Sequence, residues 1–397
     1  MEKIIRDNVH GEIVIEDKIF LDLINSPEFQ RLRRIIQLGG GQFVFPGANH
    51  TRFSHCIGVY HIISKFLNNV SFSSQLSEHE KRIVKIAGLL HDLGHGPFSH
   101  TFESISNQKH ENYTLDIILG DTNINKILKK YTIDPNEIVL IIDGKHTNQI
   151  LNLLVSSQLD ADRLDYLLRD GVNIGVSYSK IDLNWIIRNA RIFNNKIVFL
   201  EKTVNAIEHY LLGRFHMFVQ VYEHKVSVAF DQTFKMWFLR LKDLYKDGYK
   251  FKNEYYLIFL KDLMDEKILS LENYLRLDDY TMFEIIKNTK EEDDFILSDL
   301  SNRLITRKFL SAKIDIGEEE FNFKKNNFKY DFRYYFNIIK TKNIFIYREE
   351  KSAKDENIYI LRSDNELIKL SEISKILNIN MENINKNIYI FPKYNVE

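Results

Sequence analysis

The chain is poor in cysteine and proline, with one and five residues respectively among 397, and it has no long apolar run. The single cysteine, Cys56, excludes an intramolecular disulfide framework and is typical of a reducing compartment. No segment approaches the roughly 18 consecutive apolar residues of a membrane span. Residues 1–16 also lack the apolar core of a signal peptide. We therefore expect a cytoplasmic protein with no membrane partner.

An excess of charge of either sign is also missing. The chain has 54 Lys and Arg residues against 55 Asp and Glu residues, which gives a formal net charge of −1. This balance argues against a polybasic coat for nucleic acid, although it leaves local basic patches open. The length favours two or three domains with ample core.

Most of the chain has helical patterns. Residues 1–16 are the exception, because apolar and polar residues alternate on both sides of a turn-forming cluster, which predicts a hairpin. Ser26 and Pro27 predict a helix start, and the glycines at 39–41 end that helix. Further helical patterns lie at 52–70, 78–92, 147–170 and from 203 to 310.

The last part of the chain changes character. Strands are predicted at NIFIY (343–347), IYILR (358–362) and IYIF (388–391), with a helix at 366–377. These patterns predict a mostly α fold with a short N-terminal hairpin and a small C-terminal α+β lobe. We place the boundary at 310, so that 1–310 form the helical core and 311–397 form the lobe.

A cluster of titratable side chains follows the predicted helix 78–92, in LLHDLGHGPFSH (89–100). Neighbouring helical residues point about 100° apart, so His91 and Asp92 can meet one ion only at a helix end. Gly94, Gly96 and Pro97 do end the helix there. The pair is therefore either a helix terminus with a solvated acid or half of a metal site.

Two other segments offer matching ligands. His55 lies one predicted helix earlier, and Asp162 shares a polar helical stripe with Asp165 and Arg169. The alternative interpretation of that stripe is a solvated face held by the Asp165–Arg169 pair. With His91 and Asp92, these residues supply two imidazoles and two carboxylates. Such a set suits Mn, Mg, Fe, Zn or Ni and leaves coordination positions open for water and substrate.

The order and the residues of these motifs resemble those of the HD-domain phosphohydrolases, and more narrowly those of their dNTP triphosphohydrolase branch. The resemblance spans essentially the whole chain, from the hairpin to the closing lobe. The motifs that carry it are DNVHGEI (7–13), SPEFQRLRRIIQLGGGQFVFPGANHTRFSH (26–55), HDLGHGPFSH (91–100), HENYT (110–114), DADRLDYLLRD (160–170) and RFHMFVQVYEHK (214–225). The resemblance implies an HD-domain helical core with its motifs at 52–170 and a family helix at 203–230.

The resemblance also implies roles for the titratable residues. The divalent metal ion would be held by His55, His91, Asp92 and Asp162. The residues implied to act on the phosphate and the leaving oxygen are His95, His100, Glu103 and His110. Glu103 stands where some relatives have aspartate, and it is expected to orient a histidine that acts as general acid.

The implied reaction converts a dNTP and water to a deoxynucleoside and triphosphate. Arginine suits the phosphate chain because its donors form a rigid fork. Tyr222 is implied to pack against the 2′-carbon, where a ribose hydroxyl would be crowded. The full set of implied substrate-binding residues is Gln37, Arg52, Arg163, Tyr166, Asp170, Arg214 and Tyr222.

An activating nucleotide is a further implied partner. The matching positions are Lys3, Asn25, Gln30 and Arg33. Asn25 departs from the family's aspartate, and an amide offers guanine one acceptor and one donor where a carboxylate accepts two protons. Activation by another base, or none, fits better. The resemblance also implies a homo-oligomer built from dimers, as a tetramer or hexamer.

Two other functions stay open. The first is a phosphohydrolase or phosphodiesterase of the same superfamily that acts on another nucleotide. The second, of a different class, is a nucleotide-sensing oligomer or one that binds single-stranded nucleic acid. The complete ligand set and the lack of basic excess favour the dNTP triphosphohydrolase, for which depletion of dNTPs in anti-phage defence is a hypothesis.

Overall fold

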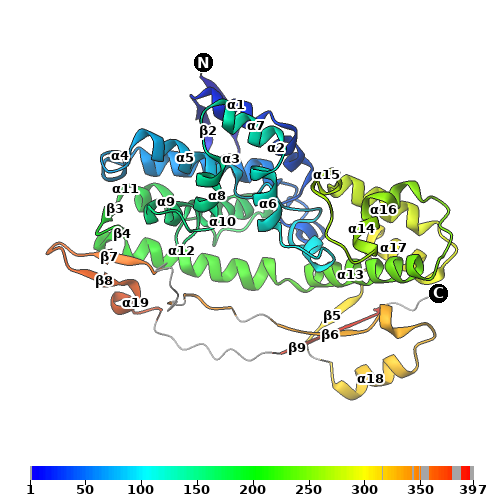
Figure 1. The fold of residues 1–397 in the computed structure, drawn as a ribbon. Coiled ribbons are helices and arrows are strands. Elements are labelled where there is room, and N and C mark those ends of the chain that lie inside the picture. The colour runs from blue at the N-terminus through cyan, green and yellow to red at the C-terminus, as the bar shows by residue number, and fades with distance from the viewer. Residues whose placement is uncertain are drawn as a thin grey trace.

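The computed structural model describes residues 2–314, 316–341, 344–347, 349, 357–377 and 386–393. Helices dominate this part of the chain, with a small sheet at the N-terminus and further short strands in the C-terminal region (Figure 1). The predicted fold class, mostly α with a hairpin and a C-terminal α+β region, is confirmed.

The helices and strands follow one another along the chain from the N-terminal hairpin to β9. The α-helices are α1 (Lys18–Ile24), α2 (Pro27–Arg31), α3 (Arg52–Leu67), α4 (Val70–Ser73), α5 (Glu78–Leu90), α6 (His110–Leu119), α7 (Asn123–Lys130), α8 (Pro135–Ile142), α9 (Gln149–Val155), α10 (Ala161–Ile174), α11 (Leu183–Arg188), α12 (Val204–Met217), α13 (Lys225–Lys246), α14 (Lys261–Met264), α15 (Leu271–Leu275), α16 (Asp279–Lys290), α17 (Phe295–Ile305), α18 (Glu318–Asn326) and α19 (Leu370–Ile373). The strands are β1 (Lys3–Asp7), β2 (Gly11–Ile15), β3 (Ala190–Phe193), β4 (Lys196–Leu200), β5 (Ser311–Lys313), β6 (Asn337–Lys340), β7 (Tyr359–Leu361), β8 (Leu367–Lys369) and β9 (Asn387–Phe391).

Strands β1 and β2 form the predicted antiparallel hairpin, in which Lys3 pairs with Ile15 and Asp7 with Gly11. The Asp7 carboxylate accepts the backbone N–H groups of Val9 and His10, which closes the turn. Ile13 and Ile15 are fully buried. The hairpin therefore packs on the helical core through one face and leaves Asp7 near α10.

Helix α5 brings the His91–Asp92 pair to the core. It begins with a capping box, in which Ser77 and Glu80 each bind the other's backbone N–H. Its residues from Ile83 onward are largely buried, and α5 packs against α3. The helix ends at Leu90 with His91 as its cap, as the glycines after it predict.

The segment 147–170, predicted as one helix, is two. α9 ends at Val155 and α10 begins at Ala161. Asp160 causes the break, because its carboxylate accepts the backbone N–H groups of Ser157 and Arg163 and so caps α10. A similar break divides the predicted family helix 203–230, where a π-helical turn (Phe218–Tyr222) separates α12 from α13.

Two C-terminal predictions were wrong. Residues 366–377 begin with strand β8, which pairs with β7 around a tight turn, and only Leu370–Ile373 are helical. Of the strand predicted at 343–347, residues 344–347 are described and are not a strand, while 343 lies outside the described residues. Tyr347 instead accepts the backbone N–H of Ile358 with its hydroxyl, so a side-chain contact holds this segment. The strands predicted at 358–362 and 388–391 are β7 and β9.

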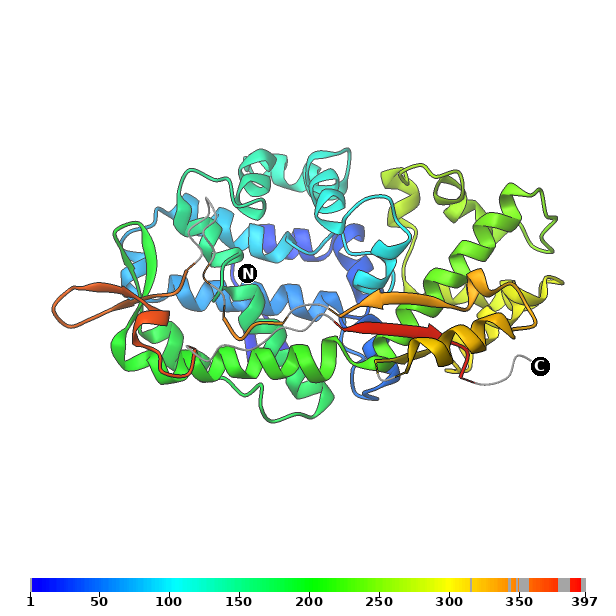
Figure 2. The ribbon, with the colours of Figure 1, turned by 90° about the horizontal axis from the view of Figure 1, so that it is seen from below.

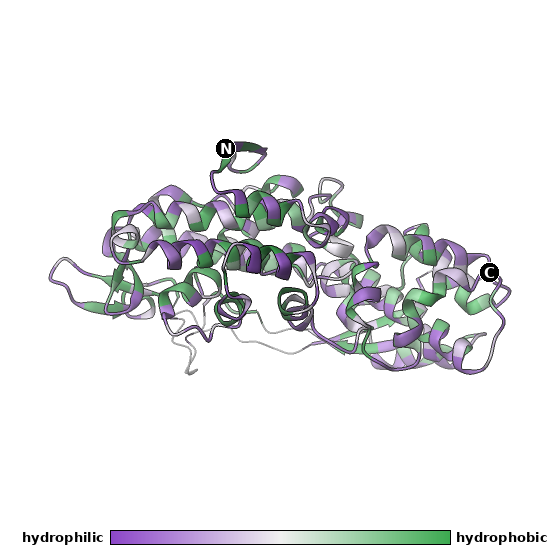
Figure 3. Ribbon diagram, turned by 45° about the horizontal axis from the view of Figure 1, so that its top comes forward, coloured by the Kyte–Doolittle hydropathy of each residue, from purple (hydrophilic) through white to green (hydrophobic). Residues whose placement is uncertain are grey.

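The buried apolar side chains form two clusters. The first gathers the helices up to α12 with β7 and β8, and the second gathers α13 to α17 with β5, β6 and β9. Figure 2 shows β7 and β8 at one end of the molecule and β9 toward the other. Apolar and polar residues alternate along the helices in Figure 3, as is typical of helices with one buried face. This grouping does not follow the boundary at 310, which stays a prediction.

Each C-terminal sheet combines distant segments. β7 pairs in parallel with β4, which extends the β3–β4 hairpin, and β9 lies between β5 and β6. Among the described residues, no helix is both long and apolar enough to cross a bilayer.

The capping box of α5 gives a stability prediction. Ser77→Ala removes the side-chain acceptor at the start of the helix, so we expect the free energy of unfolding to fall by about 1 kcal/mol. Ser74→Ala, at the end of α4, is the control and should change it less. Equal effects of the two substitutions in urea unfolding would contradict the role of the cap.

Candidate active site

The four predicted metal ligands lie together. His55 comes from α3, His91 and Asp92 from the end of α5, and Asp162 from the first turn of α10. The Nε2 atom of His55 is 3.1 Å from Asp162 Oδ1 and 3.6 Å from Asp92 Oδ2. The Nε2 atom of His91 is 3.4 Å from Asp92 Oδ1 and 3.7 Å from Asp162 Oδ1. Ligand atoms of His55, His91 and Asp92 all fall within 4.8 Å of one another.

The hydrogen bonds of the two histidines fit a bound cation. His55 donates from Nδ1 to Asp165 at 2.8 Å, and His91 donates from Nδ1 to the Gly88 carbonyl at 2.8 Å. With the ring proton on Nδ1, each Nε2 carries a lone pair. Both Nε2 atoms are buried and lack a hydrogen-bond partner. Two unpartnered lone pairs between two carboxylates are a donor set for a divalent metal ion.

Asp165 orients the His55 ligand. Its fully buried carboxylate also accepts a hydrogen bond from His10 Nε2 at 2.6 Å and two from Arg169, at 2.8 and 3.0 Å. Arg169 continues to Asp7 of the hairpin at 2.8 Å. The sequence left open whether the Asp165–Arg169 pair is solvated, and the structure shows it as a buried support of the candidate metal site.

Charge and burial oppose one another in this network. Burial raises the pKa of Asp165, but Arg169 and the hydrogen bonds from His10 and His55 hold it well below its ordinary value. Burial lowers the pKa of His55, but the neighbouring carboxylates of Asp162 and Asp165 outweigh this effect and raise the pKa to about 10. The carboxylates thus provide strong attraction for a cation at this position.

Gly58 lets the network approach α3. A Cβ atom at Gly58 would stand 1.8 Å from Asp165 Oδ1 and 2.5 Å from Arg169 Nη2. Any side chain there would displace one of these groups. Glycine is therefore needed because there is no space for a Cβ atom, and not because of the backbone conformation.

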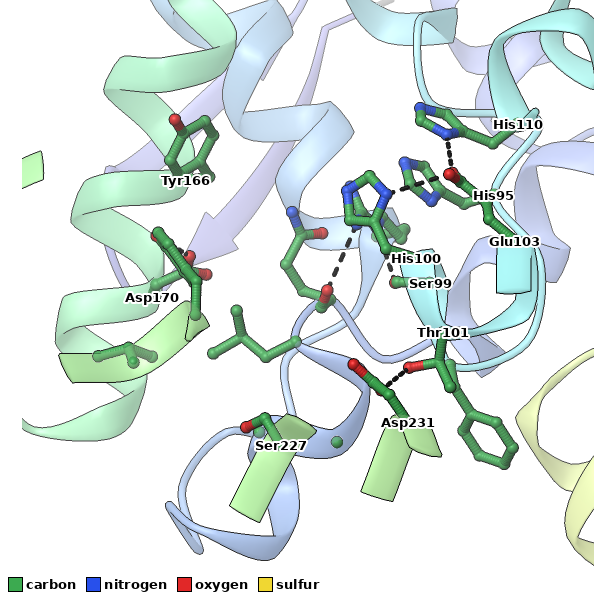
Figure 4. A pocket seen from close by; sticks show the side chains of 18 of the residues that line it. His95, Ser99, His100, Thr101, Glu103, His110, Tyr166, Asp170, Ser227 and Asp231 are labelled. Atoms are coloured by element: carbon green, nitrogen blue, oxygen red, sulfur yellow. Dashed lines mark hydrogen bonds and ion pairs between the residues drawn. The ribbon is translucent and has the colours of Figure 1, made fainter. Parts of the chain in front are cut away.

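The predicted catalytic residues form a second cluster beside the first. His95, His100, Glu103 and His110 surround one side of the pocket in Figure 4. Glu103 accepts a short hydrogen bond from His110 Nδ1 and contacts His100 Nδ1 at 3.2 Å. The rings of His95 and His110 stack with 3.8 Å between centroids. His95 Nε2 lies 3.4 Å from Asp92 Oδ1, so it joins the two clusters.

The pKa directions follow these contacts. Partial burial raises the pKa of Glu103, but hydrogen bonds from His100 and His110 lower it below its ordinary value. Burial, with the nearby charges of Arg52 and His110, holds the pKa of His95 well below its ordinary value. Glu103 is therefore ionised and His95 neutral near neutral pH.

The backbone is strained in the turn between His95 and His100. Phe98 and Ser99 adopt left-handed conformations, with φ of 57° and 54°. The carboxylate of Asp279, at the start of α16, accepts the backbone N–H groups of Phe98 at 2.7 Å and Ile36 at 3.0 Å. The second apolar cluster thereby holds the turn that carries His95 and Ser99.

Arg52 occupies the floor of the pocket. Its guanidinium donates to Asp92 Oδ2 at 2.5 Å, to Ser99 Oγ at 3.1 Å and to the Gln37 carbonyl at 3.4 Å. Gln37 is also buried, and its side-chain oxygen has no hydrogen-bond partner. Both predicted substrate-binding residues line the cavity, and the neighbours of Arg52 fix its guanidinium.

Three more predicted substrate-binding residues form the opposite wall. Tyr166 and Asp170 extend from α10 across the pocket from the histidines (Figure 4). Tyr222 donates its hydroxyl to Asp170 Oδ2 at 2.7 Å, and His50 Nε2 lies 2.7 Å from Asp170 Oδ1. The Tyr166 and Tyr222 rings meet edge to face at 6.2 Å.

Arg163 and Arg214 are placed differently. Neither lines the cavity that holds the other predicted residues. Both donate to the side-chain oxygen of Gln158, Arg163 at 3.3 Å and Arg214 at 3.2 Å. The structure thus joins these two arginines through Gln158, and their contact with substrate stays a prediction.

The predicted activator residues lie on the surface of the hairpin and first helices. Arg33 donates to Gln30 Oε1 at 2.9 Å and stacks over the Phe53 ring at 3.5 Å. Lys3 and Asn25 are exposed. For these described residues, no hydrogen bond or ion pair connects Lys3 or Asn25 with the Gln30–Arg33 pair.

Sequence reasoning missed several residues that support the site. Asp165 orients His55 and is itself held by His10, His50 holds Asp170, and Gln158 joins the two arginines. His10 lies in DNVHGEI, a motif that carries the family resemblance but gave this histidine no role. The Asp279 contacts left no signal in the sequence, because they join residues more than 180 positions apart.

Comparison with known proteins agrees with this geometry. Residues 52–170 match the HD domain family, and residues 181–240 match the HD associated region. The protein YwfO of Bacillus subtilis strain 168 is 39% identical over 324 residues, which cover 80% of this chain and 73% of YwfO. A phosphohydrolase of Bacteroides thetaiotaomicron VPI-5482 superposes with a TM-score of 0.86 at 29% identity, covering 99% of this chain and 100% of that one.

A more distant relative carries a named activity. The deoxynucleoside triphosphate triphosphohydrolase SAMHD1 homolog of Dictyostelium discoideum is 33% identical over 273 residues. The match covers 63% of this chain and 53% of that protein, so the chain corresponds to about half of its length. The family resemblance predicted from the motifs is confirmed.

The support of His55 gives a prediction about metal affinity. Asp165→Asn keeps the shape but removes the negative charge that fixes the His55 ring, so we expect metal affinity to fall about 10- to 100-fold. Asp116→Asn on α6, an exposed position, is the control. Metal titration by calorimetry measures both, and an unchanged affinity in Asp165→Asn would contradict the assigned role.

Proposed function

Because this chain belongs to the HD-domain phosphohydrolases, we propose that it is a metal-dependent deoxynucleoside triphosphate triphosphohydrolase. The substrate would be a dNTP, and the products a deoxynucleoside and intact triphosphate. The SAMHD1 homolog of Dictyostelium, whose name states this activity, supports the choice.

One observation carries the proposal: the two histidine clusters face a single cavity. Its volume is about 660 Å³, and its lining includes Asp92 and Asp162 of the metal cluster and His95, Glu103 and His110 of the second. A nucleotide in this cavity would place its α-phosphate between the two clusters and its sugar toward α10. The arrangement supports nucleophilic attack on one side of phosphorus and proton donation on the other.

His55, His91, Asp92 and Asp162 would hold the divalent ion. Once bound, the ion supplies Lewis acidity and an activated water for attack on phosphorus. Arg52 faces the same phosphate and offsets part of the roughly four negative charges of a dNTP. Because Asp92, Ser99 and Gln37 hold its guanidinium, little side-chain entropy is lost when substrate binds.

The second cluster would supply the proton for the leaving 5′-oxygen. Glu103 binds His110 Nδ1, which leaves Nε2 as the atom that gives up a proton. The Glu103 carboxylate also fixes the orientation of the His110 ring. His95 packs against that ring and, as a neutral imidazole, can hydrogen-bond the phosphate oxygens without adding charge.

The opposite wall would select the sugar. Asp170 accepts from Tyr222, so the tyrosine ring is fixed at the position predicted to crowd a ribose 2′-hydroxyl. Gln37 and Tyr166 offer polar groups to the 3′-hydroxyl. The choice of base, activation by a nucleotide, dimer-based assembly, cytoplasmic location, binding of single-stranded nucleic acid and a role in anti-phage defence stay predictions.

A turnover assay tests the proposal. Purified protein with Mn or Mg and each dNTP should release triphosphate, and chelation of the metal should stop the reaction. His91→Ala should abolish turnover, because the ion loses a ligand. His79→Ala on the same helix, an exposed histidine paired with Glu137, should keep it. Release of pyrophosphate or monophosphate would instead favour another phosphohydrolase or a phosphodiesterase.

Glu103 gives a second test of the mechanism. Glu103→Gln keeps a hydrogen-bond acceptor for His110 but removes the negative charge beside the ring that would donate the proton, so kcat should fall about 10²- to 10⁴-fold. Glu111→Gln removes an exposed carboxylate 3.4 Å from the same His110 nitrogen and should retain most of the turnover. Equal losses in both variants, with unchanged KM, would show that Glu103 has no special role.

A further inference from the structure

A second cleft lies at the end of the helical body where α4, α11 and β3 come together (Figure 1). Its volume is about 670 Å³. Its lining residues are Lys65, Asn68, Asn69, Val70, Ser71, Asn184, Ile187, Arg188 and Arg191. None of them lines the catalytic cavity. Lys65 is ten residues beyond His55 on α3, which is about 15 Å along the helix axis.

The charged residues that line this cleft are all positive. Lys65, Arg188 and Arg191 contribute three cations, and no carboxylate is among its lining residues. The chain as a whole has almost equal numbers of acidic and basic residues. Three unopposed cations therefore create a local positive potential that the overall composition does not show.

The cationic side chains of this cleft also have N–H groups that are available to a ligand. Among the described residues, Arg191 donates only from Nη1, to the backbone carbonyls of Arg188 and Ala190, and Lys65 donates to Asn184 Oδ1 at 2.8 Å. Arg188 is exposed and its guanidinium makes no hydrogen bond within the described ranges of the chain. None of the three forms an ion pair there. The free guanidinium edges suit bidentate binding of phosphate oxygens.

The neutral lining residues further restrict the class of ligand that the cleft can bind. Asn68 and Ser71 add polar groups, while Val70 and Ile187 are the apolar part. No aromatic side chain is among the described residues that line the cleft, so it lacks the stacking surface that sites for single-stranded nucleic acid and for bases use. The chemistry favours a chain of phosphates over a base.

We infer that this cleft binds a linear polyphosphate, supplied as inorganic tripolyphosphate or as the triphosphate of a nucleotide. Arg188 and Arg191 bind the phosphate oxygens through their free guanidinium edges, and Lys65 contributes a further charge. The inference does not depend on the proposed activity, because the cleft and the catalytic cavity share no residue.

Calorimetric titration of the metal-loaded 397-residue chain with inorganic tripolyphosphate tests this inference. Loss of one arginine–phosphate contact should weaken binding at this site by about tenfold in Arg188→Gln. The Arg188 guanidinium is exposed and makes no hydrogen bond to another described residue. The variant should therefore fold normally and keep basal dNTP turnover. Arg276→Gln, which removes an exposed arginine paired with Glu272, is the matched control and should bind like the unmodified protein.

Hydrogen exchange locates the site, with protection by tripolyphosphate expected at residues 65–71 and 184–191. A parallel titration with a non-hydrolysable dNTP analogue identifies the source. If both ligands bind with equal affinity, the cleft recognises the phosphate chain alone. If the analogue binds more tightly, the ligand is a nucleotide. Either result supports the inference. Unchanged affinity in Arg188→Gln, or protection confined to the catalytic cavity, overturns it. Lack of dNTP turnover would overturn the proposed function and leave this binding result intact.

Discussion

The buried carboxylate of Asp165 is the group on which the geometry of the candidate metal site depends. It accepts hydrogen bonds from His55, His10 and Arg169, which come from three different parts of the chain. A buried charge is stable only when its partners are all in place, and loss of one leaves it uncompensated. The hairpin, α3 and α10 must therefore pack correctly at the same time for His55 to present its free nitrogen. Gly58 shows how closely these elements approach.

The chemistry also depends on the junction between the two apolar clusters. The strained backbone at Phe98 and Ser99 lies there, and Asp279 from the second cluster holds it. Ser99 in turn binds Arg52, which contacts Asp92 of the metal site. A shift of α16 relative to the first cluster would move these groups together. The second apolar cluster is thus a structural support of the candidate active site.

Much of the site was predictable because its residues lie in compact motifs. His91 and Asp92 had to end a helix to meet one ion, and the glycines after them indicated that end. The contacts that orient the ligands could not be predicted, since His10 and Asp165 are 155 residues apart and either could be solvated on sequence grounds. Short apolar segments were the least reliable. Residues 367–369 fit a helix or a strand equally by pattern, and pairing with β7 decides for the strand.

The C-terminal strands have a consequence for how the protein is made. β4 pairs with β7, and β9 is the central strand between β5 and β6, so both sheets need residues from the last part of the chain. A ribosome delivers β4 and β5 long before these partners. During synthesis those strands have unpaired edges, which are templates for association with other chains. A chain that ends before residue 359 should therefore be more prone to aggregation than the 397-residue chain.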